Sequence, residues 1–188
     1  KNYGSLDLRP GGRINTLIVG GLISYSQNTN PGFIMKNCEN SGNVTFVGAG
    51  NGTAKNVAYV GGVIGFIGDC QNSEIDNVKN SGAIEFSNLT VNAAATTGGC
   101  YVAGCIPYIA NLATATESVP SITNLTNTGD INVNISVTSA TATPYIAGCV
   151  GLCCTSLTTA TNTGNITMSG KTGGSLVIGG VASTLQAG

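Results

Sequence analysis

Histidine is absent from this chain of 188 residues, and charged residues make up only 8% of it. Nucleophilic catalysis by serine or cysteine needs an activating base, most often histidine, so the sequence offers no Ser-His-Asp or Cys-His arrangement. The net charge of −1 provides no basic patch for nucleic acid or anionic lipid. We therefore expect no nucleic-acid partner, and solubility has to come from Asn, Thr, Ser and Gly.

Long hydrophobic runs are absent as well. The stretches TLIVGGLISY and YVAGCIPYIA are interrupted by Gly or Pro, and each has about half of the roughly 20 apolar residues that a membrane-spanning helix needs. No membrane span is expected. The chain starts at Lys1 without an initiator Met or a signal-peptide pattern, so we interpret it as a processed product or as part of a longer repeat chain.

A repeated pattern occupies most of the sequence. It centres on turn glycines followed by alternating apolar residues, which is typical of a strand with one buried face. The expected turn glycines are Gly12, Gly42, Gly82, Gly129 and Gly164, and the positions two residues later are Ile14, Val44, Ile84, Ile131 and Ile166. A strand that enters each turn has its last apolar column at Leu8, Cys38, Val78, Leu125 and Ala160.

A Gly-rich strand follows each turn strand after a loop of variable length. Its copies read LIVGGLIS, YVGGVIGF, YVAGCIPY, YIAGCVGL and LVIGGVAS. Three short strands per repeat predict an all-β, right-handed β-solenoid of about five coils, formed by residues 1–188 as a single domain. The alternative divides each repeat into two smaller coils, because the variable loop could contain another corner.

Asparagine recurs beside the turns. Two residues before the glycines the sequence has Asn40, Asn80, Asn127 and Asn162, and five residues before them it has Asn37, Asn77 and Asn124. Stacked Asn side chains can hydrogen-bond into ladders. We expect such ladders at the corners, with the turn glycines supplying a positive φ.

The periodic pattern N-[ST]-G-x-[IV]-x, followed by [YL]-[VI]-x-G-x, resembles the Gly-rich GLUG-type and related β-solenoid repeats of exported bacterial and protist surface proteins. The likeness covers nearly the whole chain. It implies an adhesive or structural role at a cell surface, and it brings no catalytic residue and no cofactor. The seven cysteines depart from the usual bacterial pattern.

The cysteines are not spaced as zinc ligands, and without histidine a zinc site is not expected. Cys105 and Cys149 share one column of the Gly-rich strand. Neighbouring strands place equivalent Cα atoms about 4.8 Å apart, which a disulfide allows. We therefore predict that they stack and form a disulfide, whereas Cys38 should be a buried thiol unless a loop brings Cys70 to it.

Acidic residues are densest at Asp69, Glu74 and Asp76. Calcium binding or a carboxylate pair for sugar hydrolysis would need such groups to converge. The competing interpretation places them as outward polar residues beside the buried Ile75. The stretch GAGNG at residues 48–52 lacks the lysine and helix of a phosphate-binding loop.

Six Asn-x-Ser/Thr sequons occur in this Asn- and Thr-rich chain. In a secreted eukaryotic protein some of them would carry glycans. Asn51, Asn88 and Asn134 lie in or near the variable loop and are the better candidates. A glycan on Asn124 would disrupt an asparagine ladder.

Two surfaces are predicted to mediate assembly. If alternation continues through the Gly-rich strand, Val63 and Ile67 point outward and form an uncharged stripe that needs covering. The ends of the solenoid expose strand edges, so Leu6 and Leu8 of one copy would meet the end of another copy. Ile178 and Val181 are expected at that opposite end.

These features favour an extracellular structural protein, the subunit of a filament, coat or adhesive stalk that stacks head to tail. The alternative is a carbohydrate- or receptor-binding adhesin without catalytic activity, for which aromatic side chains should line one face. A polysaccharide-active enzyme would need convergent carboxylates, and the chain has only eight acidic residues. Ice binding would need threonines at a fixed offset in every coil, which is not observed.

Overall fold

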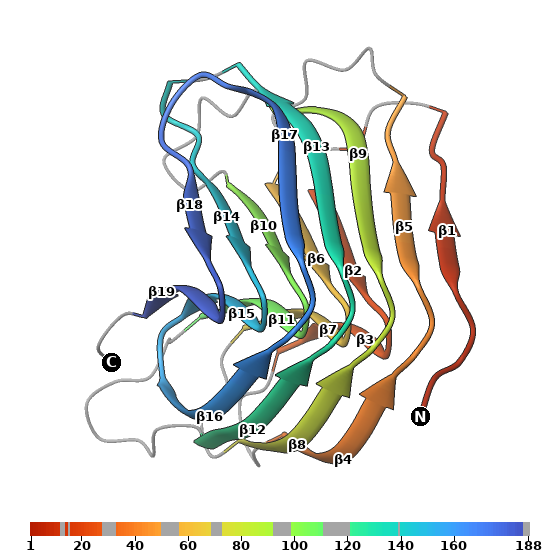
Figure 1. The fold of residues 1–188 in the computed structure, drawn as a ribbon, viewed down its shortest axis with the longest axis vertical. Helices are drawn as coiled ribbons and strands as arrows, with labels where there is room; N and C mark the ends of the chain where they lie inside the picture. Colours follow the sequence, from red (N-terminus) through yellow and green to blue (C-terminus); the bar gives the residue numbers. More distant parts are fainter. Residues whose placement is uncertain are drawn as a thin grey trace.

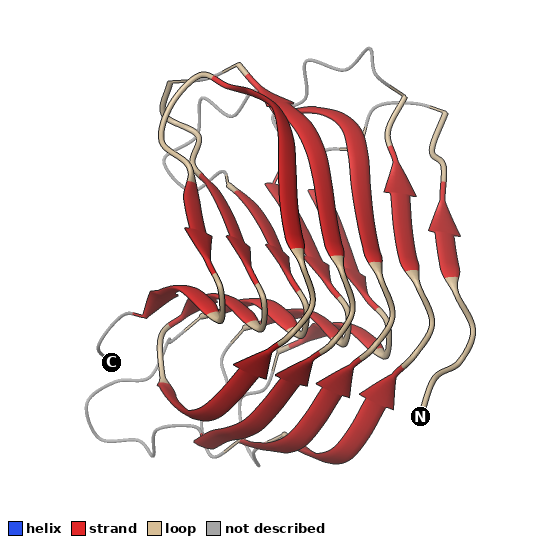
Figure 2. Ribbon diagram, viewed as in Figure 1, coloured by secondary structure: helices blue, strands red, loops and turns tan. Residues whose placement is uncertain are grey.

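The structure, a computed structural model, describes residues 1–11, 14, 16–27, 33–49, 57–68, 73–91, 99–110, 121–138 and 140–185. Within these ranges the regular elements are nineteen β-strands, and no helix is found (Figure 2). All of the strand pairs described are parallel, as expected when each coil stacks on the next. The protein is therefore an all-β solenoid, as the repeats predict.

The strands form four sheets, which we name A to D, and each coil contributes one strand to each sheet, except that the first coil contributes none to sheet A (Figure 1). Sheet A contains β4 (Ile34–Asn40), β8 (Glu74–Asn80), β12 (Ser121–Asn127) and β16 (Ser156–Asn162). Sheet B contains β1 (Leu6–Leu8), β5 (Val44–Val47), β9 (Ile84–Val91), β13 (Ile131–Val137) and β17 (Ile166–Thr172). Sheet C contains β2 (Thr16–Gly20), β6 (Val57–Gly61), β10 (Cys100–Ala103), β14 (Pro144–Ala147) and β18 (Val177–Gly179). Sheet D contains β3 (Ile23–Ser26), β7 (Ile64–Ile67), β11 (Ile106–Ile109), β15 (Val150–Cys153) and β19 (Ala182–Leu185).

The coil has four strands, not the three predicted, because a corner divides the Gly-rich segment. In the second coil, β6 ends at Gly61 and β7 begins at Ile64. A Cβ on Gly62 would overlap the carbonyl oxygen of Gly104 in the next coil, so only glycine fits this bend. Each repeat forms one coil, since Ile75 pairs with Ile122 of the next repeat, and the alternative of two coils per repeat is not found.

The first coil is shifted relative to the prediction. Leu6 pairs with Val44 and Leu8 with Phe46, which makes Gly4 the equivalent of the turn glycine Gly42. The sequence NYG at residues 2–4 is therefore the first copy of the NSG turn. The predicted turn at Gly12 was wrong, because the spacing from Gly12 to Ile14 equals the glycine-to-isoleucine spacing of the true repeats. Gly12 itself lies outside the described residues.

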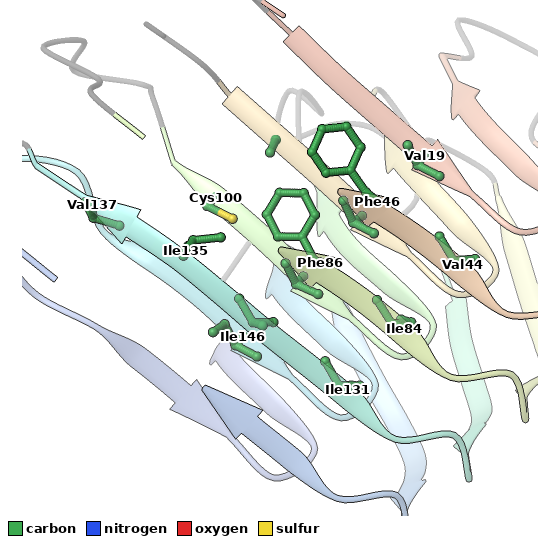
Figure 3. Packing of buried hydrophobic residues seen from close by; sticks show 14 of the residues in the cluster. Val19, Val44, Phe46, Ile84, Phe86, Cys100, Ile131, Ile135, Val137 and Ile146 are labelled. Atoms are coloured by element: carbon green, nitrogen blue, oxygen red, sulfur yellow. The ribbon is translucent and has the colours of Figure 1, made fainter. Parts of the chain in front are cut away.

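The core consists of two clusters because the coil is bent into an L (Figure 2). Sheets B and C enclose the first cluster, in which the rings of Phe46 and Phe86 pack 5.2 Å apart (Figure 3). Sheets A and D enclose the second, which includes Ile75 and Ile106. These residues come from the predicted apolar columns and are almost completely buried. The two clusters meet at the elbow of the L, where polar side chains and not apolar ones fill the interior.

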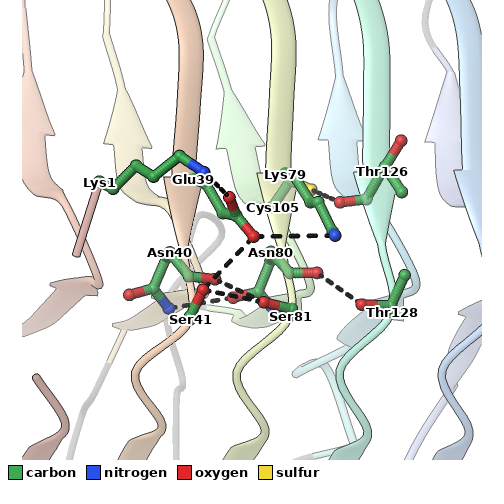
Figure 4. Close-up of polar contacts among 10 residues, drawn as sticks. All are labelled: Lys1, Glu39, Asn40, Ser41, Lys79, Asn80, Ser81, Cys105, Thr126 and Thr128. Carbon is green, nitrogen blue, oxygen red and sulfur yellow. Dashed lines mark hydrogen bonds and ion pairs between the residues drawn. The ribbon is translucent and has the colours of Figure 1, made fainter. Parts of the chain in front are cut away.

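A ladder of asparagines spans the elbow, as predicted (Figure 4 shows the rungs at Asn40 and Asn80). The Nδ2 of Asn40 donates to Oδ1 of Asn80 at 3.0 Å and to the carbonyl of Gly42 at 2.7 Å. The same two bonds recur along the column Asn2, Asn40, Asn80 and Asn127, and the column ends at Asn162. Asn40, Asn80 and Asn127 are completely buried, so the ladder satisfies polar groups that would otherwise be costly.

The positive φ expected of the turn glycines belongs to a different column. Asn37, Asn77 and Asn124 have φ between 52° and 55°, a region that asparagine tolerates better than most residues. Asn77 donates to Asn37 at 2.6 Å, so part of the second predicted ladder is present on the surface. The turn glycines are needed for space instead, because a Cβ on Gly82 would overlap the carbonyl oxygen of Gly42.

Candidate interaction surfaces

Charged side chains are segregated between the sheets. The strands of sheets C and D contain no charged residue. The strands of sheets A and B carry Asp7, Lys36, Glu39, Glu74, Asp76, Lys79, Glu85 and Lys171. The outer side of the elbow between sheets C and D is therefore an uncharged surface, and it lies in the inner angle of the L (Figure 2).

Two rows of aromatic rings occupy this inner angle, and we call them together the aromatic seam: Tyr59, Tyr101 and Tyr145 from sheet C, and Tyr25, Phe66 and Tyr108 from sheet D. Within each row the rings stack, with centroids 4.9 to 5.3 Å apart and interplanar angles of 3° to 11°. Edge-to-face contacts join the two rows, such as Tyr101 to Tyr108 at 4.9 Å. Both arrangements are favourable for aromatic pairs.

The strand pattern explains why these rings point outward. Tyr59 lies between Ala58 and Val60, which both belong to the inner cluster, so alternation places its ring on the opposite face of sheet C. Parallel pairing in register then aligns Tyr59 with Tyr101, and Tyr101 with Tyr145. The signal for this row in the sequence is the recurring Tyr before the buried Val or Ile.

The seam presents ring edges and neutral hydroxyl groups. Burial raises the pKa of Tyr59 to about 12 and also raises the pKa values of Tyr101 and Tyr108. Tyr101 is only 8% exposed. No hydrogen bond joins its hydroxyl to any part of the chain that the structure describes. The seam therefore contains a tyrosine hydroxyl whose hydrogen-bond partner is not supplied by the described residues.

The predicted outward stripe of the Gly-rich strand is wrong. Val63 is fully buried and Ile67 is 1% exposed, and both belong to the cluster between sheets A and D. The corner at Gly61 and Gly62 interrupts the alternation, so residues on both sides of it face the interior. Cys105, the equivalent of Val63 one coil later, is buried as well.

The exposed large hydrophobic residues concentrate at the two ends of the solenoid, which we call the axial faces. Among the described residues they are Tyr3, Leu6, Tyr25 and Ile34 on the first coil and the first strand of sheet A, and Leu176, Ile178 and Leu185 on the last coil. Of the predicted end residues, Leu6 is 36% and Ile178 48% exposed. Leu8 and Val181 are half-buried and pack against the core clusters.

Cys105 and Cys149 occupy consecutive rungs, as predicted, but they are thiols and not a disulfide. The Cys105 N–H donates to the Cys149 carbonyl at 3.1 Å. A hydrogen bond to Cys149 and burial raise the pKa of the Cys105 thiol well above its usual range. Cys38 is a half-buried thiol 3.3 Å from the carbonyl of Lys36. Cys70 lies outside the described residues.

The acidic residues do not form a metal site within the described ranges. Glu74 forms an ion pair with Lys36 at 2.6 Å. Asp76 accepts hydrogen bonds from Thr123 at 2.6 Å and Asn124 at 2.8 Å, which lower the pKa of its carboxyl group. Both are outer-face residues beside the buried Ile75, and Asp69 is not among the described residues.

Two of the three preferred sequon asparagines can be placed. Asn88 lies at an irregularity of β9 with φ 58°, and its Nδ2 donates to the Gly48 carbonyl at 2.7 Å. Asn134 is exposed on the outer face of β13. Asn51 falls outside the described residues. Asn134 therefore has the more accessible amide of the two.

Comparison of the chain with profiles of protein families, with curated protein sequences and with solved structures gives no match. Within the described residues, no helix is long and apolar enough to cross a membrane.

Proposed function

We propose that this chain is a structural β-solenoid unit of an extracellular filament, coat or adhesive stalk, and that copies assemble head to tail through their axial faces. The observation that carries the proposal is that, among the described residues, the exposed large hydrophobic residues belong to the first coil, the first strand of sheet A and the last coil. Unpaired strand edges lie there as well, and such edges are templates for pairing with another chain.

The strands and the asparagine ladder both have a direction. Because all strand pairs are parallel, a second copy continues the sheets only in the same orientation. In the ladder, each Nδ2 donates to Oδ1 of the following rung. At the last rung, Asn162 donates to Gly164, and its second N–H has no acceptor among the described residues. An Asn2 side chain of the next copy would extend the ladder.

Stacking would pair β17 with β1, β18 with β2 and β19 with β3 of the next copy. Sheet A has one strand fewer than the other sheets, so one strand position would separate β16 from the next β4. Ile34, which is 67% exposed, borders that position. The extracellular location and the absence of catalysis rest on the resemblance to GLUG-type repeats of exported proteins.

The test uses two variants that each disable one axial face. Leu6→Lys places a charge on the first coil and Ile178→Lys places one on the last, while Asn134→Lys on the outer side of β13 is the control. Sedimentation velocity and negative-stain electron microscopy should show fibres for the unmodified chain and the control, and monomers for each face variant.

Mixing the two face variants makes the test specific for head-to-tail contacts. Each variant retains one intact face, so the mixture should form dimers and nothing longer. A monomeric unmodified chain at every concentration would refute the proposal, and so would fibres in either face variant alone.

A second candidate function is ligand binding by a non-catalytic adhesin. The aromatic seam favours it, because aromatic side chains on one face were the feature expected of a carbohydrate-binding solenoid.

A further inference from the structure

We propose that the aromatic seam binds an extended, neutral glycan chain that lies parallel to the solenoid axis, with the Tyr59, Tyr101 and Tyr145 hydroxyl groups as its hydrogen-bonding row. The inference deepens the second candidate function and is independent of end-to-end assembly. It starts from Tyr101, a residue that is 8% exposed and whose hydroxyl has no hydrogen-bond partner within the described residues. Such a group is costly unless a ligand or an ordered water completes it.

The hydroxyl groups, and not the ring faces, are available for recognition. Stacking uses the faces of Tyr101 on both sides, against Tyr59 and Tyr145. A sugar therefore cannot stack on these rings as it does in sites with isolated aromatic residues. Tyrosine hydroxyls are protonated at physiological pH, so the row consists of neutral donors that can also accept hydrogen bonds.

The absence of charge on sheets C and D selects the ligand class. A polyanion such as a sulfated glycan would meet no cation on the strands around the seam, and a cationic peptide would meet no carboxylate. A neutral polymer with many hydroxyl groups has no such mismatch. It can exchange hydrogen bonds with tyrosine hydroxyls and cover the half-buried ring edges at the same time.

The shape of the coil disfavours a second copy at this site. Only a convex part of another molecule could enter the inner angle of the L, and the convex corner between sheets A and B carries Glu39 and Lys79. Placing these charges against an uncharged surface would cost desolvation energy. A single extended polymer chain is thin enough to avoid that cost.

The spacing of the row also suits a linear polymer. The stacked rings repeat every 4.9 to 5.2 Å along the axis, and the rise per sugar of an extended β-linked glycan is close to the spacing of β-strands. Successive sugars could therefore meet successive tyrosine hydroxyls. A short chain of sugars would span the row, whereas a single sugar would contact one rung only.

The experiment measures binding of the full chain to insoluble cellulose and chitin by co-sedimentation, and to cellohexaose and chitohexaose by calorimetry. Heparin is the anionic comparison. Tyr101→Phe keeps the ring and removes the hydroxyl, and should weaken binding about threefold to tenfold, the value of one hydrogen bond. The triple change of Tyr59, Tyr101 and Tyr145 to Phe should remove detectable binding.

Tyr3→Phe is the matched control, because Tyr3 is 71% exposed and lies outside the seam, and its binding should equal that of the unmodified chain. Circular dichroism verifies that each variant is folded. The proposal is overturned by absence of binding to all four neutral glycans, by binding to heparin alone, or by full binding in the triple variant. None of these results affects fibre formation, so failure here is distinguishable from failure of head-to-tail assembly.

Discussion

Equivalent glycines at the corner between sheets C and D provide a matched pair of substitutions. The column consists of Gly21, Gly62, Gly104, Gly148 and Gly180. A Cβ on Gly62 would overlap the carbonyl oxygen of Gly104 and the side chain of Asn80. A Cβ on Gly180, at the last rung, would have no heavy atom within 4 Å. The same change, glycine to alanine, therefore meets a crowded site at one rung and open space at another.

The expected magnitudes follow from what each new methyl group displaces. At Gly62 the obstacle is a backbone carbonyl that cannot move without shifting a coil, and overpacking of this kind costs about 1 to 3 kcal/mol. Displacing Asn80 would add about 1 kcal/mol for each hydrogen bond lost. We expect Gly62→Ala to lower the free energy of unfolding by about 3 to 5 kcal/mol. Gly180→Ala should change it by less than about 0.5 kcal/mol, or raise it slightly by restricting the unfolded chain.

Urea unfolding followed by circular dichroism measures both values. Gly180→Ala has a second expected effect, because each Cβ position in this column meets the carbonyl of the following rung. In a head-to-tail stack that carbonyl would belong to Gly21 of the next copy, so the variant should fold normally and remain monomeric. Equal stability losses for the two variants would refute the description of the corner. Fibres formed by Gly180→Ala would contradict the proposed contact.

Four further results are expected. Tyr101→Phe should raise the free energy of unfolding by about 1 kcal/mol in urea titrations, because it removes a hydroxyl without a described partner from a residue that is 8% exposed. A loss of that size would show that the hydroxyl is satisfied within the fold. Asn80→Ala should lower the free energy of unfolding by about 2 to 4 kcal/mol, since buried groups of Asn40, Gly82 and Asn127 lose their hydrogen-bond partners. Replacing the exposed Asn134 by Ala should change it by less than about 0.5 kcal/mol. Burial raises the pKa of Tyr59 from 10 to about 12, so this residue ionises first in the unfolded chain. Its contribution to stability is fully present below about pH 10 and should be lost as the pH rises towards 12, and urea midpoints that do not change over this range would contradict it. Burial raises the pKa of Cys100 to about 12, and the pKa of the Cys105 thiol is raised as well. Both thiols should therefore resist iodoacetamide until urea unfolds the chain. Rapid labelling of the folded chain, detected by mass spectrometry, would refute their buried placement.

Much of the fold follows from periodicity alone. Columns such as Val44, Ile84 and Ile131 recur at a fixed distance from the turn glycines, and the structure stacks them in one buried row. Alternation was less reliable at the Gly-rich segment, because the glycine that recurs in each copy permits a corner that reverses which residues face inward. Val63 is buried for this reason. A pattern of period two holds only within one strand, and the recurring glycine at this corner is the mark of the bend in the sequence.

Only part of the aromatic seam could be predicted from the sequence, for a related reason. The repeated tyrosine at Tyr59, Tyr101 and Tyr145 predicts a row on one sheet once the phase of the strand is known. Its contact with Phe66 and Tyr108 depends on the angle between two sheets, which is set by the glycine corner and the asparagines beneath it. The chain has only four Phe and six Tyr, and six of these ten residues gather in the seam.

The two proposed surfaces lie in different directions on the same solenoid. Stacked tyrosine rungs occupy the three middle positions of their row in sheet C, and the outer positions are filled by Ile18 and Val177. Copies joined through the axial faces would therefore leave each tyrosine row exposed along the flank, separated from the next row by aliphatic side chains. Assembly would multiply the binding rows without altering any of them. Gly180→Ala should accordingly bind neutral glycans with unchanged affinity per copy, while Tyr101→Phe should still form fibres. A loss of both properties in either variant would show that the seam and the axial faces are one surface and not two.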